Sequence, residues 1–225
     1  MAGILAIRQV YLHHGQVDVA QPLSTLVPSL DGDVLTVLAR TEAPLTGRRV
    51  AALARRGSRP GVQTILDRLV DHGVVHAQPA GPSTLFTLNR EHLLAEPVIL
   101  AVTARDRLLS RLREHIEGWH VPAAHTSLFG STARGDAGPP SDIDVVVVRP
   151  AGVDPDEPAW VDQLATLEGL VEAWTGNSLA WFETTEEGLA SADSEREPLL
   201  ESLRRDAIHL TGRRLGDLVH VTRAS

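Results

Sequence analysis

The sequence predicts an α/β (α+β) protein made of two domains joined by a helix, and three observations predict it. Between residues 30 and 96, apolar residues recur three times at helical spacing and then alternate as in a β-hairpin. Residues 97–120 form an amphipathic helical stretch. Residues 121–225 alternate short apolar strands with helices, which is typical of a mixed sheet with flanking helices. Residues 1–29 are an N-terminal extension to these units.

The composition is that of a globular protein of 225 residues and limits the possible chemistry. Hydrophobic residues make up 43% and charged residues 22%, so the chain has enough apolar side chains for a sizeable core. The absence of cysteine excludes disulfides, thiolate catalysis and cysteine-based metal sites. No segment approaches the ~18 apolar residues needed to span a bilayer, and no export signal is evident. We therefore expect a cytoplasmic protein that does not enter a membrane.

The charge is distributed unevenly. All 21 basic residues are arginine, so any phosphate contact must come from a guanidinium group or the backbone. Residues 1–100 carry 9 arginines against 8 acids, whereas residues 101–225 carry 12 against 21. The net charge of −8 therefore belongs to the second half of the chain.

Three helices are expected in the first domain. The first covers residues 31–40 and is ended by Pro44. Thr46 is a natural N-cap for a second helix over residues 47–55. A third helix runs from residue 58 to residue 72, with apolar residues at i, i+3, i+4, i+7 and i+8 from Val62.

A β-hairpin is expected next, with strands at residues 74–78 and 83–88 around a turn at residues 79–82. Three helices and a hairpin are the outline of a winged helix-turn-helix. The segment resembles bacterial winged-helix regulators in which a leucine-rich third helix ends in Asp-His-Gly-Val-Val, here residues 71–75. The resemblance implies that the third helix enters the major groove of DNA and that the protein binds as a homodimer on paired half-sites.

From Arg40 to Pro60 there are six arginines and one glutamate, which supports DNA binding by this unit. The resemblance places phosphate contacts on the second helix and base contacts on the third. The expected DNA-binding residues are Arg48, Arg49, Ser58, Arg59, Gln63, Thr64 and Arg68. The alternative is a winged helix used for dimerisation or partner docking.

The connecting stretch, residues 97–120, is expected to join the domains and pack against the second. Its apolar stripe is Leu108, Leu109, Leu112 and Ile116. Beyond it we expect strands near 127–129, 145–148, 178–183 and 207–212, with helices at 160–174 and 197–205.

Two carboxylates stand two positions apart at the start of the valine-rich strand, in Ser141-Asp142-Ile143-Asp144. Both side chains therefore leave one face, while Ile143 enters the core. Close carboxylates repel each other unless a cation lies between them, and oxygen ligands without cysteine suit Mg²⁺, which is commonly held by carboxylates together with substrate phosphates. Upstream, Gly130-Ser131 forms a turn that allows close approach of the backbone to a ligand.

The order of strand, Gly-Ser turn, short helix and Asp-x-Asp strand resembles the nucleotidyltransferase superfamily that includes DNA polymerase β, and in particular the prokaryotic minimal nucleotidyltransferases. By that resemblance Asp142 and Asp144 are catalytic and hold Mg²⁺, or Mn²⁺ in its place. The resemblance also implies that a nucleoside triphosphate is bound by Gly130, Ser131, Arg134 and Ser141.

The pattern departs from the family at a third carboxylate, which generally comes from a neighbouring strand. The matching strand here has Leu-Ala-Trp-Phe at its centre. Glu183 is the nearest candidate for a catalytic third carboxylate, although period-2 alternation directs it to the opposite face from Ala180.

Two functions remain open from the sequence. The first is a DNA-binding transcriptional regulator whose nucleotidyltransferase-fold domain binds Mg-nucleoside triphosphate; the missing carboxylate leaves catalysis undecided. The alternative is an active nucleotidyltransferase that modifies a hydroxyl of a protein, an RNA or a small molecule. In that case the chain can also act as an antitoxin that modifies a partner protein.

Overall fold

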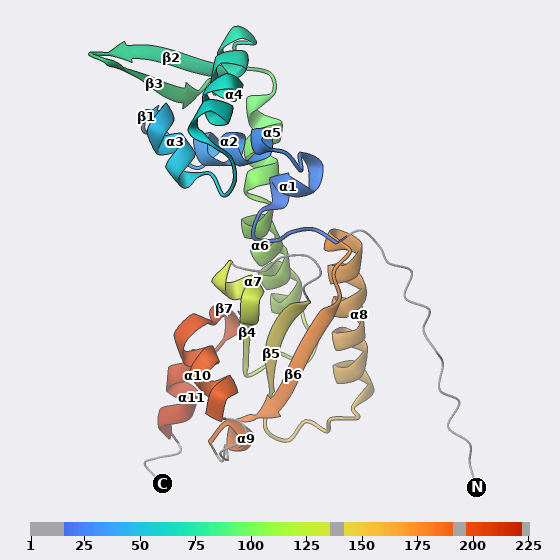
Figure 1. Cartoon of the computed structure of the whole chain (residues 1–225). Coiled ribbons are helices and arrows are strands. Elements are labelled where there is room, and N and C mark those ends of the chain that lie inside the picture. The colour runs from blue at the N-terminus through green and yellow to red at the C-terminus, as the bar shows by residue number, and fades with distance from the viewer. Residues whose placement is uncertain (1–15, 136–141, 191–196, 222–225) are drawn as a thin grey trace, which may run out of the picture.

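The computed structural model describes residues 16–135, 142–190 and 197–221, which fold into two units connected by helices (Figure 1). The N-terminal unit is a group of helices with a projecting hairpin. The C-terminal unit is a mixed sheet with helices on both faces. Within the described ranges, no helix combines the length and apolarity required to cross a membrane.

The N-terminal unit contains the three helices and the hairpin expected between residues 30 and 88. Thr46 caps the second of the three predicted helices, Gly47–Leu53, by accepting a hydrogen bond from the Arg49 N–H (3.2 Å), as predicted. A short strand and a first helix were not predicted. The elements are α1 (Pro22–Leu26), α2 (Leu30–Ala39), β1 (Leu45–Thr46), α3 (Gly47–Leu53), α4 (Arg59–Asp71), β2 (Val75–Ala80) and β3 (Ser83–Leu88). The strands form an antiparallel sheet in the order β1-β3-β2.

The hairpin turn is shorter than the sequence suggested. Ala80 pairs with Ser83, so the loop is only Gly81 and Pro82, and Gly81 adopts a φ of +59°. The predicted four-residue turn was wrong because Pro79 stays in the strand. β2 is an edge strand, where the missing N–H of a proline is tolerated.

The connection between the units is two helices, α5 (Ala95–Val102) and α6 (Ala104–Glu117), separated at Thr103. Each helix belongs to a different core. Ala95 and Val102 of α5 are buried with the N-terminal unit, whereas the predicted stripe on α6 is buried with the C-terminal unit. A strap of residues 17–22 also passes between the units: Val19 joins the C-terminal core, and Leu23, just after it, joins the N-terminal core.

The C-terminal unit is a four-stranded sheet in the order β6-β5-β4-β7. β5 and β6 are parallel, and the other pairs are antiparallel, so the expected mixed sheet is present. The elements are β4 (His125–Phe129), α7 (Gly130–Arg134), β5 (Ile143–Arg149), α8 (Pro158–Thr175), β6 (Leu179–Thr185), α9 (Glu186–Ala190), α10 (Glu197–Asp206), β7 (Ile208–Gly212) and α11 (Leu215–Val221).

The two faces of β5 have different neighbours, and this fixes where the carboxylates lie. Ile143, Val145 and Val147 pack in the core formed with α6 and α8. Val146 and Val148 pack on the other face, in the core that contains Leu203 of α10 and Leu218 of α11. By strand alternation Asp144 lies on this second face, close to the N-terminal end of β5.

Candidate active site

The two aspartates lie where β5 begins. Asp142 is exposed and directly precedes the strand, and Asp144 is partly buried within it. In the sheet Asp144 pairs with Phe129, the last residue of β4, and with Ala180 on β6. The carboxylates therefore lie at one end of the sheet, beside the turn that leaves β4.

Gly130 starts α7 directly after β4 and lies against the Asp144 carboxylate. Its φ is +70°, a left-handed conformation that L side chains rarely adopt. A Cβ placed on Gly130 would stand 2.2 Å from Oδ2 of Asp144. The backbone conformation thus favours glycine here, and any side chain at this position would displace the Asp144 carboxylate or the turn.

The electrostatic surroundings of Asp144 disfavour its negative charge. The pKa of Asp144 is raised above its ordinary value, first by burial and next by the negative charge of Asp142, while the positive charge of Arg134 opposes the shift. Ionising Asp144 therefore costs free energy in the folded protein. A bound cation would offset that cost, which is the electrostatic condition expected of a metal site.

Arg105 on α6 holds the helix that follows Gly130. Its Nε and Nη2 donate to the carbonyl oxygen of Thr132 (3.2 and 3.0 Å), and Nη2 also donates to that of Ala133 (2.7 Å). The Thr132 hydroxyl donates to the carbonyl oxygen of Asp142 (3.3 Å) and links α7 to the start of β5. Sequence reasoning missed Arg105, because an arginine on a helix flank carries no signal of the carbonyl groups it will meet in the fold.

Arg134 ends α7 and lies near a third acidic residue. Its Nη1 is 3.9 Å from Oδ2 of Asp206, which also pairs with Arg205 at 2.8 Å. The pKa of Asp206 is lowered, mainly by the hydrogen bond from Arg205 and further by the charge of Arg134. The charge of Arg134 therefore acts on both Asp206 and Asp144. Asp206 was not predicted, since it is the last residue of α10 and lies far from the motif in sequence.

Ser131 and Ser141 are the other two residues predicted to contact the nucleotide. Ser131 follows Gly130 in the first turn of α7 and is partly buried. Ser141 lies outside the described residues.

Glu183 does not join the aspartates, and its prediction as a third carboxylate requires correction. It pairs with Val147, so it lies on the α8 face of the sheet and three positions along from Asp144. There its Oε1 accepts hydrogen bonds from Nε of Arg149 (2.7 Å) and Nε1 of Trp160 (3.2 Å). The residue of β6 beside Asp144 is Ala180, which has no carboxylate.

The donor set fits a metal held partly by substrate. In the three described ranges, no group of three or more histidine, aspartate or glutamate side chains could hold a metal ion. Asp142 and Asp144 supply hard oxygen donors, and Mg²⁺ is often bound through one or two carboxylates plus substrate phosphates. The residues present therefore fit a cation that arrives with a triphosphate.

Three of the residues predicted to contact DNA line one groove. Arg48 and Arg49 on α3 and Arg59 at the start of α4 border a groove of about 420 Å³. All three are exposed, and none has an ion-pair partner within the described residues.

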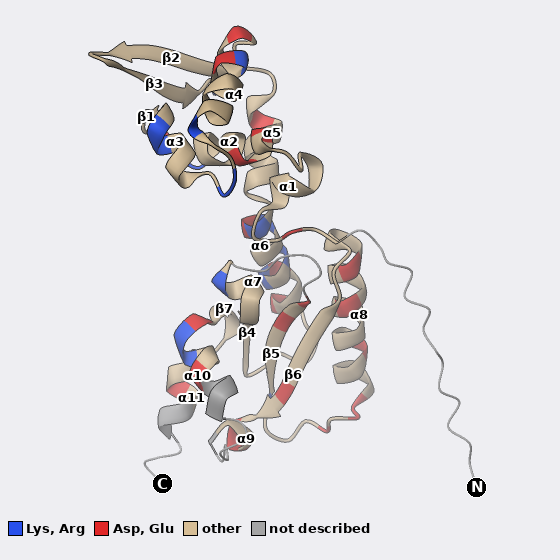
Figure 2. Cartoon of the chain, in the orientation of Figure 1, with Lys and Arg blue, Asp and Glu red and all other residues tan. Residues whose placement is uncertain are grey.

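The other four make contacts within the chain. Ser58 caps α4 by accepting from the Gly61 N–H (3.3 Å). The Gln63 amide donates a hydrogen bond to Asp67 (2.7 Å), and the Thr64 hydroxyl donates one to the carbonyl oxygen of Pro60 (3.0 Å). Arg68 forms an ion pair with Asp31. The hairpin of β2 and β3 carries no Lys, Arg, Asp or Glu, whereas α3 carries Arg48 and Arg49 (Figure 2).

One family model matches the segment that holds the aspartates. Residues 108–190 match the family model of the nucleotidyltransferase domain. The matched segment runs from α6 to α9 and includes Gly130, Asp142 and Asp144. No curated protein matches the chain.

Several solved structures have limited similarity. A toxin–antitoxin complex with AMP-PNP is 19% identical with a TM-score of 0.36, and covers 52% of this chain and 84% of its own. A mutant of the toxin–antitoxin MntA-HpeT is 16% identical with a TM-score of 0.34 and the same two coverages. Human N-acetylserotonin methyltransferase with SAM is 20% identical with a TM-score of 0.27, and covers 44% of this chain and 31% of its own. All three TM-scores are below 0.5.

Proposed function

We propose that the protein is a Mg²⁺-dependent nucleotidyltransferase that transfers a nucleoside monophosphate from a nucleoside triphosphate to a hydroxyl group. The observation that carries the proposal is the contact of the Gly130 backbone with the Asp144 carboxylate, beside the exposed Asp142. This arrangement lies inside the segment that matches the nucleotidyltransferase domain. Both observations favour the enzyme over a protein that acts only as a DNA-binding regulator.

Each residue of the site has a distinct part in the proposal. Asp142 and Asp144 hold Mg²⁺, or Mn²⁺ in its place, which when bound neutralises charge on the triphosphate and on the departing pyrophosphate. The backbone at Gly130 and Ser131 contacts the phosphates. Arg134, which lies 3.9 Å from Asp206, adds positive charge next to them.

The transfer exchanges one phosphorus–oxygen bond for another. The acceptor oxygen bonds to the α-phosphorus, the bond from that phosphorus to the bridging oxygen breaks, and pyrophosphate leaves. The hydroxyl proton passes to solvent, because Ala180 occupies the position beside Asp144 where a carboxylate base would stand. A general base typically contributes 10²–10⁴-fold to rate, so we expect slow turnover.

The acceptor is a protein side chain, an RNA end or a small molecule, and one experiment separates these classes. The protein is incubated with each pool of acceptors and with a triphosphate labelled on either the α- or the γ-phosphate. We expect label from the α-phosphate to enter one pool and label from the γ-phosphate to be released as pyrophosphate. The Asp142→Ala, Asp144→Ala double variant should transfer neither. Transfer of the γ-label would indicate a kinase and contradict the proposal.

A second candidate function is DNA binding by a winged helix-turn-helix in the N-terminal unit, as a dimer on paired half-sites. The specific observation in its favour is the groove bordered by Arg48, Arg49 and Arg59. If phosphates occupy this groove, Arg48→Gln and Arg59→Gln should each reduce the salt dependence of binding to duplex DNA by about one unit. Arg204→Gln, an exposed arginine on α10, removes the same charge as a control. Equal effects of all three variants would contradict a specific contact.

The two candidates are compatible in one chain. A protein that binds its own operator and modifies a partner toxin would need both units, and this antitoxin role predicts a protein acceptor in the labelling experiment. Light scattering of the purified protein tests the dimer directly.

A further inference from the structure

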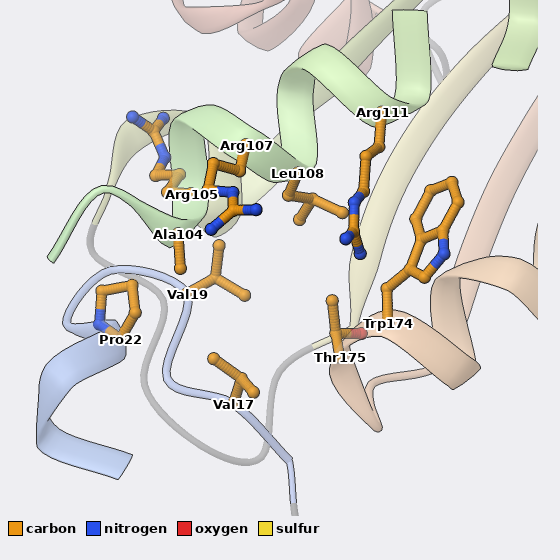
Figure 3. Close-up of a pocket in the computed structure, with 10 residues that line it drawn as sticks. All are labelled: Val17, Val19, Pro22, Ala104, Arg105, Arg107, Leu108, Arg111, Trp174 and Thr175. Carbon is orange, nitrogen blue, oxygen red and sulfur yellow. The ribbon is translucent and has the colours of Figure 1, made fainter. Parts of the chain in front are cut away.

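A cavity of about 220 Å³ lies between the connecting helix α6, the end of α8 and the strap of residues 17–22 (Figure 3). It is separate from the aspartates: its lining contains neither of them. Its walls come from segments about 150 residues apart in the sequence, so the cavity exists only when the strap is docked.

The strap is fixed to the end of α8 by three hydrogen bonds at one residue. The Val17 N–H donates to the carbonyl oxygen of Thr175 (3.0 Å) and to Oδ1 of Asn177 (3.2 Å). The Asn177 amide in turn donates to the carbonyl oxygen of Val17 (3.3 Å). Val19 is buried in the C-terminal core two residues later. The wall made by the strap is thus a built part of the fold.

The charge of the cavity is opposite to that of the unit around it. Arg105, Arg107 and Arg111 line it, and no acidic residue does. Arg105 is engaged with α7, whereas Arg107 and Arg111 have no ion-pair partner among the described residues. Residues 101–225 carry 21 acids against 12 arginines, so two such guanidinium groups on one wall select for an anion.

The remaining walls are apolar or aromatic. The guanidinium of Arg111 lies 5.5 Å from the centre of the Trp174 ring, and Figure 3 shows its side chain reaching from α6 towards that ring. Val17, Val19 and Leu108 face the same space. Polar groups that converge on a mainly apolar cavity are the usual form of a small-molecule site.

We propose that this cavity binds a small organic anion, with a phosphate or carboxylate group on Arg107 and Arg111 and a flat apolar body against Trp174 and the strap. Its volume is below the roughly 300–1,000 Å³ of sites for drug-sized ligands, so the occupant has about the size of a single substituted ring. The inference is independent of the nucleotidyltransferase proposal, since it uses neither aspartate.

The probes are phenyl phosphate and benzoate, with inorganic phosphate and phenol as the two halves tested separately. Binding to the full chain is followed by NMR through the indole N–H signal of Trp174, which is assigned with the Trp174→Phe variant. The shift of this one signal reports the cavity even if a probe also binds among the phosphate-contacting residues near Gly130.

We expect phenyl phosphate or benzoate to shift the Trp174 signal saturably, and each isolated half to bind at least tenfold more weakly. Arg107→Gln and Arg111→Gln should each weaken binding about tenfold, because each removes a charge-assisted hydrogen bond to the anion. Arg204→Gln, with the same change of charge outside the cavity, should leave the affinity unchanged. Absence of a saturable shift with both ring anions would overturn the proposal, as would equal weakening in all three arginine variants.

Discussion

Replacing Gly130 with alanine should damage the site more than it damages the fold. The new Cβ would lie 2.2 Å from Oδ2 of Asp144, whereas ordinary contacts begin at 3.4 Å, so the carboxylate or the turn must move by about 1.2 Å. A shift of this size at a reacting centre can cost about 10²-fold in rate. The left-handed φ of +70° adds about 1–2 kcal/mol of backbone strain for alanine.

Gly152 provides the matched control for the backbone cost. It has a φ of +82° in the loop after β5, and a Cβ there would meet no atom within 4 Å. Gly152→Ala should therefore lose about 1–2 kcal/mol of unfolding free energy through backbone strain alone. The aspartate site should be unaffected in this variant.

Urea denaturation and titration with Mg-nucleoside triphosphate measure the two effects in the same samples. We expect both alanine variants to be destabilised, and only Gly130→Ala to lose nucleotide affinity, by at least tenfold. If Gly130→Ala bound nucleotide as well as Gly152→Ala, the close approach to Asp144 would have no part in the site, and the reasoning would be refuted.

Four other changes have defined outcomes. The pKa of Asp144 is raised in the folded protein, so the folded state binds this proton more tightly than the unfolded chain does. The resulting contribution to stability is complete below the unfolded-state pKa of about 3.9 and is lost as pH rises through the raised pKa. Asp144→Asn should therefore raise the melting temperature at pH 7, and this gain should disappear near pH 3. Burial lowers the pKa of His125, so urea stability should fall as pH drops below about 6.5, and less steeply in His125→Gln. Glu183→Gln should cost about 1–3 kcal/mol of unfolding free energy, by weakening its partly buried contacts with Arg149, yet leave nucleotide affinity unchanged; a loss of affinity would return it to the site. Ala180→Asp should raise the transfer rate about 10²-fold or more, and an unchanged rate in a folded variant would mean that no base is missing.

The parts of the site that the sequence predicted are those carried by local spacing. Gly130, Asp142 and Asp144 lie within fifteen residues, and strand alternation alone places both carboxylates on one face. The same alternation indicated that Glu183 faces away from Ala180. The structure agrees, because Ala180 pairs with Asp144, whereas Glu183 pairs with Val147, which packs on the opposite face. In this strand, the two-residue alternation was sufficient to predict which side chains share a face.

The parts that the sequence did not predict depend on tertiary contacts. Arg105 and Asp206 join the site because α6 and α10 pack near α7. In the sequence, neither residue can be distinguished from an ordinary exposed charged residue. The division of the connecting segment at Thr103 follows from its two halves packing in separate cores. Likewise, the ion pair of Arg68 with Asp31 joins residues 37 positions apart, which a helix pattern cannot show.

Calorimetric titration with ATP, GTP, CTP and UTP, with and without Mg²⁺, tests most directly the claim that Gly130, Asp142 and Asp144 form a metal–triphosphate site. We expect at least one triphosphate to bind only with Mg²⁺, and the Asp142→Ala, Asp144→Ala double variant to bind none. Absence of binding by the intact protein, or equal binding by the double variant, would contradict the account.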